Sequence, residues 1–203
     1  MKLKFVLLIL TAADMLVAWW WDARVCLGII GMETHSFFQL ADHLFIPLVC
    51  IYAANKAPWI VLDFLLLSAI GEVLHSISRL LSGIAFAASH VIMCTVFWPK
   101  TVSIDWYCAA GIVPVVSFFA YFASGGGHWI DVVFPLAGCV ILSLSGRKFM
   151  IPHAGYLLYV ISASLYSFSV KRELTVLITP TFHIAVVTLV YSATKHVQGL
   201  DRE

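Results

Sequence analysis

Glu72, His75 and His90 are the residues of this chain whose types and spacing could do proton chemistry. Glu72 and His75 are three residues apart, so on an α-helix both would project from one face. All three residues lie inside segments apolar enough to span a membrane, where ionisable groups are costly and by default mark functional sites. Because a carboxyl group and an imidazole can donate and accept protons at neutral pH, these residues predict an acid–base site within a membrane.

The composition predicts an integral membrane protein. Of the 203 residues, 62% are hydrophobic and 11% are charged, and the mean hydropathy is +0.97; a soluble domain carries about 25% charged residues. The net charge is +1 and the basic residues are scattered, so we expect no nucleic-acid partner. The five cysteines are far apart and mostly inside apolar runs, which favours small buried side chains over a disulfide framework. We expect no cofactor and no resident metal.

The apolar segments that must position these side chains number eight. Each is long enough to cross a hydrocarbon core of about 30 Å. The connections are too short to hold a soluble domain. The sequence therefore predicts an all-α, polytopic membrane bundle in which the whole chain, residues 1–203, forms a single domain. The eight windows are 3–21, 37–54, 57–77, 80–98, 104–124, 129–146, 150–169 and 174–193.

The distribution of basic residues predicts the orientation of the bundle. With eight spans both termini lie on one side, together with eight of the twelve lysines and arginines. Because loops that remain in the cytoplasm are enriched in these residues, we expect cytoplasmic termini, and in a bacterium a location in the inner membrane. Asp42, His43 and Glu72 would then lie a few residues below the outer surface, and His90 and His183 nearer the midplane.

Small residues predict close packing between two of the spans. Gly83 and Ala87 form a small-xxx-small stripe on segment 80–98, and His90 follows about one turn later. We therefore expect segments 57–77 and 80–98 to pack tightly. We also expect Glu72, His90 and Asp42 to face a shared polar cavity, because exposing their charged forms to lipid would cost roughly 2.5 kcal/mol or more.

Two of these segments carry motifs that resemble a known family. Residues 69–74, Ala-Ile-Gly-Glu-Val-Leu, and the stretch from Gly83 through Phe86 to His90 are similar to motifs of the YhhN family of membrane proteins, which includes the lysoplasmalogenases. Residues 41–48 and 155–163 are similar to two further segments of that family. Three positions depart from its pattern: Glu72 and Asp42 stand where Asp and Lys are usual, and Ala163 where a second signature Asp is expected.

The resemblance implies hydrolysis of the vinyl ether bond of a lysoplasmalogen-type lysophospholipid, which gives a fatty aldehyde and a glycerophospho-alcohol. An enol ether needs a proton on carbon and a water molecule directed at the resulting oxocarbenium ion. Glu72 would be the acid, and Asp42, His90 or His75 would compensate for the missing carboxylate. The expected catalytic residues are Glu72, His90 and Asp42. The expected contacts to a lysophospholipid or other single-chain lipid are His75, His43, Ser162, Arg79, Lys171 and Arg172, with the last three binding phosphate.

Two alternatives remain open on the same residues. A metal-dependent lipid hydrolase could use nitrogen and oxygen ligands from several helices, namely Glu72, His75, His90, His43 and His183. A non-catalytic lipid-binding or transport protein could use the same polar groups to bind a headgroup, and the alanine at position 163 favours this alternative.

Overall fold

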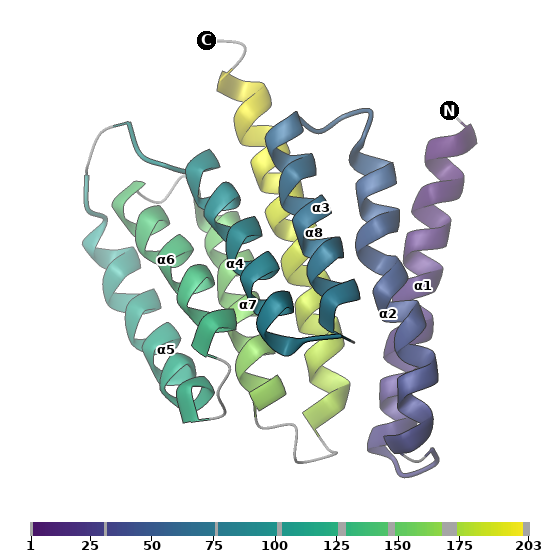
Figure 1. Ribbon diagram of the computed structural model, residues 1–203. Helices are drawn as coiled ribbons and strands as arrows, with labels where there is room; N and C mark the ends of the chain where they lie inside the picture. Colours follow the sequence, from purple (N-terminus) through teal and green to yellow (C-terminus); the bar gives the residue numbers. More distant parts are fainter. Residues whose placement is uncertain are drawn as a thin grey trace.

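The computed structural model describes residues 2–30, 32–75, 77–100, 103–125, 129–145, 149–167 and 174–200. Within these ranges the side chains of 2, 32–42, 79, 108, 119–120, 122–125, 129–131, 166–167, 175 and 200 are not described. The described residues form eight α-helices and no β-strand (Figure 1). The all-α prediction is therefore confirmed for this part of the chain.

Each predicted apolar segment corresponds to one helix. The largest differences are at α8, which continues seven residues past its window, and at α1 and α2, where α1 ends five residues after its window and α2 begins five residues before its own. The apolar run of the first segment stops before Asp22 and Arg24. Charged side chains do not prevent backbone hydrogen bonding, so α1 continues through these two residues. The helices are α1 (Lys2–Cys26), α2 (Met32–Ala53), α3 (Trp59–His75), α4 (Arg79–Val96), α5 (Trp106–Gly125), α6 (Trp129–Ser145), α7 (Met150–Ser167) and α8 (Thr175–Leu200).

Successive helices run in opposite directions, so the two chain ends lie at the same end of the molecule (Figure 1). The most extensive helix pairs are α7 with α8 and α3 with α4. Helix α8 also contacts α1, while α5, α6 and α7 contact one another. The prediction that both termini lie on one side agrees with this arrangement.

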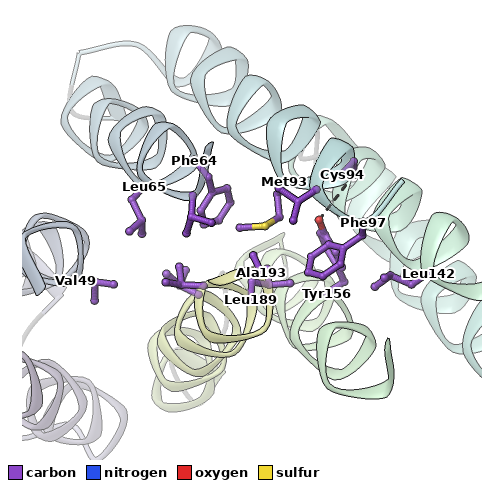
Figure 2. Close-up of a cluster of buried hydrophobic side chains, with 14 of the residues drawn as sticks. Val49, Phe64, Leu65, Met93, Cys94, Phe97, Leu142, Tyr156, Leu189 and Ala193 are labelled. Atoms are coloured by element: carbon purple, nitrogen blue, oxygen red, sulfur yellow. Dashed lines mark hydrogen bonds between the residues drawn. The ribbon is translucent and has the colours of Figure 1, made fainter. Parts of the chain in front are cut away.

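The apolar core lies where α3, α4, α7 and α8 meet (Figure 2). Phe64, Met93 and Leu189 are fully buried there. Tyr156 is also fully buried, and its hydroxyl lies 3.8 Å from the sulfur of Cys94. Gly138 of α6 makes room for this ring, because a Cβ atom at that position would lie 2.5 Å from Cζ of Tyr156. The Tyr156 ring can thus occupy this part of the core because residue 138 has no side chain.

Helices α3 and α4 approach closely, as the small residues predict. A Cβ atom at Gly71 would lie 2.9 Å from the ring of Phe86. Gly83 is buried as well. Gly71 of α3 and Phe86 of α4 therefore lie at the same height along the bundle. Other side chains on these two helices can be placed relative to that height.

Two helical segments of the described chain, Leu3–Cys26 and Val176–Gly199, are long and apolar enough to cross a bilayer. The first is mostly exposed in this structure and the second is a little under half buried. The other apolar segments are 10–17 residues long where they are described. These two segments support an association with the membrane.

Candidate functional site

The structure pairs Glu72 with His43. Nδ1 of His43 lies 3.3 Å from Oε2 of Glu72, within ion-pair distance. His43 lies midway along α2, and Glu72 lies three residues before the end of α3, at the end of that helix away from the chain termini (Figure 1). The two side chains are 28% and 14% exposed, so the pair is partly shielded from the surroundings. An imidazole and a carboxyl group at this distance attract each other, and a shift of a few tenths of an ångström brings them within hydrogen-bond reach for proton transfer.

Helix geometry explains why this pair forms. Glu72 is one residue from Gly71, whose bare backbone faces α4, so the Glu72 side chain lies about 100° further round α3. That rotation directs Glu72 toward α2, which contacts α3 along the other side. Ser68, one turn below, is buried and donates to the carbonyl of Phe64 at 2.8 Å, so its hydroxyl is satisfied within α3.

The other expected outer-half residues are placed less completely. His75 is the last residue of α3 and is exposed. Asp42 precedes His43 on α2 and Arg79 begins α4, but the side chains of both lie outside the described residues. Lys171 and Arg172 lie outside them altogether. The expected phosphate contacts of Arg79, Lys171 and Arg172 therefore stay predictions.

His90 is enclosed by aromatic rings and is 2% exposed. Its ring centroid lies 4.3 Å from that of Tyr159, 5.8 Å from that of Phe64 and 6.1 Å from that of Tyr156. Among the described residues, neither of its ring nitrogens has a hydrogen-bond partner. Because His90 follows Phe86 by one turn of α4, it lies about 6 Å deeper than the level of Gly71 and Glu72. The structure thus places Glu72 and His90 at different depths.

His183 occupies a third environment. It is fully buried on α8, and its Nδ1 accepts a hydrogen bond of 3.1 Å from Nε1 of Trp19 on α1. Its ring stacks on Phe45 with centroids 4.0 Å apart. The lone pair on Nδ1 is therefore engaged in joining two helices. Across the described residues, no three His, Cys, Asp or Glu side chains are grouped so that they could hold a metal ion, which counts against the metal-dependent alternative there.

Ser162 and Ala163 lie on α7. The Ser162 hydroxyl is buried and donates to the carbonyl of Ile178 on α8 at 2.9 Å. The same carbonyl accepts a hydrogen bond of 2.8 Å from the hydroxyl of Thr181. Ser162 thus links α7 to α8, and the expected lipid contact at this residue stays a prediction. Ala163 packs beside the core.

The pair of His43 with Glu72 is the feature that sequence reasoning missed. His43 was expected to contact substrate, and this expectation stays a prediction; the structure places its ring beside Glu72. Equal depth was the available signal, because both residues were expected a few positions below the same surface on neighbouring antiparallel spans. The sequence did not indicate the hydrogen bond from Trp19 to His183. Trp19 lies in a run of three tryptophans, which is typical of a membrane interface and not of a buried hydrogen bond.

Comparison with known proteins adds no relative: the chain matches no family model, no curated protein and no solved structure. The likeness to the YhhN family consequently rests on the sequence motifs alone, those around Glu72 and His90 and the segments 41–48 and 155–163.

Proposed function

We propose that the chain is a multi-pass integral membrane protein in which all eight helices span the bilayer. Large aliphatic side chains are exposed midway along helices, such as Leu16 on α1, Leu66 on α3 and Ile84 on α4. A soluble protein seldom exposes contiguous apolar surface on this scale, whereas lipid covers such side chains at no cost. The shortest helices have 17 residues and a length of about 26 Å, close to the thickness of the hydrocarbon core.

Aromatic residues near the helix ends support the same proposal. Trp59, Trp98 and Trp106 are exposed at the end of the bundle that holds the termini, and Trp20 and Tyr121 are exposed near the opposite end. Tryptophan and tyrosine concentrate at the two boundaries between membrane and water. Near the end opposite the termini, the Arg24 guanidinium also lies 4.6 Å from the ring centroid of Trp20. These side chains form two bands separated by the exposed aliphatic side chains.

Within this bundle we propose a hydrolase that cleaves the vinyl ether bond of a lysoplasmalogen-type lysophospholipid. The pair formed by His43 and Glu72 is the observation that carries the proposal. Glu72, protonated beside a neutral His43, donates its proton to the enol ether carbon, and the imidazole then stabilises the carboxylate that remains. Partial shielding favours this neutral form over two separate charges. Glu72 lies three residues before the end of α3, and we propose that the ether linkage of the lysolipid reaches this level.

The substitution Glu72→Gln tests this function. The amide keeps the shape of the side chain and its hydrogen bonding but cannot protonate carbon, so turnover should fall by at least about 100-fold, the usual contribution of a general acid. Purified protein in detergent would be incubated with vinyl ether and ester lysolipids, and released aldehyde and fatty acid measured. Asp63→Asn is the matched control, because Asp63 is an exposed carboxylate on the same helix.

The possible outcomes separate an enzyme from a lipid-binding protein. Aldehyde release by the wild-type protein and the Asp63→Asn variant, but not by Glu72→Gln, supports the hydrolase. Equal release by Glu72→Gln and the wild type removes Glu72 from the reaction. Lysolipid binding without any release of aldehyde or fatty acid by the wild type supports the non-catalytic alternative.

A further inference from the structure

His90 carries two hydrogen-bonding nitrogens in an apolar enclosure. A neutral imidazole has one donor and one acceptor, and among the described residues both lack a partner. Aromatic rings from α3 and α7 surround it. A charged imidazolium would be costly there, so the ring is neutral in the resting protein. A neutral imidazole remains able to donate one hydrogen bond and to accept another.

His90 shares this arrangement with His153, which is also buried with neither ring nitrogen paired among the described residues, but not with His183. The rings of His90 and His183 are both almost completely buried and pack against aromatic side chains, but His183 accepts a hydrogen bond from Trp19. Leaving a buried polar group unsatisfied costs about 1–3 kcal/mol, and such groups in folded proteins commonly mark bound water or a functional site. The neighbouring hydroxyl of Ser89 does not supply the bond, because it donates to the carbonyl of Phe86 at 2.7 Å.

We propose that His90 is a binding site for a neutral hydroxyl group, occupied by a water molecule in the resting protein. The water donates to one imidazole nitrogen or accepts from the other, and the aromatic rings isolate it from bulk solvent. The site is distinct from the pair of Glu72 and His43, since it lies about one helical turn deeper at the junction of α3, α4 and α7.

In the hydrolysis proposed above, and resting on that proposal, this water is the nucleophile. Glu72 donates a proton to the β-carbon of the enol ether, which leaves an oxocarbenium ion. The water oxygen forms a bond to the cationic carbon while a hydrogen bond to the neutral imidazole of His90 orients the molecule, and the proton that the water loses passes to the Glu72 carboxylate, which restores the acid. The hemiacetal then collapses to aldehyde and alcohol as its hydroxyl proton passes to the ether oxygen. The sum is addition of one water molecule, so no oxidant or other co-reactant is required.

Nuclear magnetic resonance tests the site without depending on turnover. Protein labelled with ¹⁵N-histidine and reconstituted in lipid should show a cross-peak between water protons and an imidazole N–H that disappears in His90→Phe. The cross-peak should persist in His183→Phe, and in Tyr156→Phe and Tyr159→Phe, which exclude relay through the two phenols. If His90→Phe does not fold, His90→Gln serves to assign the signal. Absence of the cross-peak from the wild-type protein would overturn the proposal.

Stability and turnover measurements give two further readouts. His90→Phe should leave the melting temperature nearly unchanged, whereas His183→Phe should lower it by several degrees, because that change leaves the Trp19 N–H without an acceptor. An equal loss of stability in both variants would make His90 a structural residue. Turnover by a folded His90→Phe protein at the wild-type rate would remove the water from the reaction, whereas loss of turnover supports its role.

A titration distinguishes water from the hydroxyl of a bound lipid. Adding a non-hydrolysable alkyl ether lysolipid should leave the water cross-peak in place if the lipid stops at the level of Glu72. Replacement of that signal by a cross-peak to the lipid hydroxyl would assign the site to the glycerol instead of to water. If the wild-type protein shows the water signal but hydrolyses no lysolipid, the proposed site at His90 is supported and the proposed hydrolase function is contradicted.

Discussion

The partner of each histidine determines what its ring can do. His43 contacts a carboxyl group and can exchange a proton with it. His183 accepts from an indole and therefore joins two helices. His90 packs against aromatic rings, and among the described residues neither of its ring nitrogens has a hydrogen-bond partner. Under the proposals above, one residue type serves chemistry, packing and binding within a single bundle.

The bond between Trp19 and His183 should contribute to stability. Trp19→Phe removes the indole N–H and leaves Nδ1 of the buried imidazole without that donor, so we expect the free energy of unfolding to fall by about 1–3 kcal/mol. Trp20→Phe is the neighbouring control, because Trp20 is exposed and its contact with Arg24 is worth only about 0.5–1 kcal/mol. Thermal unfolding in detergent would compare the two. A Trp19→Phe protein as stable as Trp20→Phe would show that the bond contributes little.

At the scale of elements, positions of the helices could be predicted from the sequence but their rotations could not. Long apolar segments between polar connections predicted the ends of each helix to within seven residues. Nothing in an apolar segment distinguishes its faces when nearly every residue is apolar. The pairing of Glu72 with His43 depends on the face that Gly71 presents to α4, and this became visible only in the structure.

The glycines on α5 and α6 also could not be assigned to a packed or an open helix face from the sequence, and substituting them tests the assignment that the structure makes. Gly138→Ala on α6 would place a Cβ atom 2.5 Å from the Tyr156 ring, so the ring or the helix must move, at a cost of about 1–3 kcal/mol. Gly111→Ala on α5 meets no described atom within 4 Å and should be neutral or slightly stabilising, since alanine favours a helix. Unfolding of both variants would be compared with the wild type. Equal stabilities would mean that the contact between Gly138 and Tyr156 can relax freely.

At the scale of the whole molecule, the exposed aliphatic and aromatic side chains occupy different levels along the bundle. Aliphatic side chains are exposed along the middle of α1, α3 and α4, and aromatic side chains are exposed toward both ends of the bundle. The mean hydropathy predicted a membrane location, but the bands require the folded structure, because they combine residues from distant parts of the chain. The bands also give the expected boundaries of the hydrocarbon core.

The proposed orientation makes the two connections that flank α3 lie on opposite sides of the membrane. A protein whose native cysteines are replaced would carry one new cysteine at a time, Asn55→Cys before α3 or Ile77→Cys after it; both positions are exposed. A maleimide that cannot cross membranes should label Ile77→Cys in intact cells and Asn55→Cys only after permeabilisation, because the positive charge places the termini and Asn55 in the cytoplasm. The reverse pattern would keep the eight spans and invert the orientation. Labelling of both positions from the same side would contradict a span at α3 and with it the eight-helix membrane bundle.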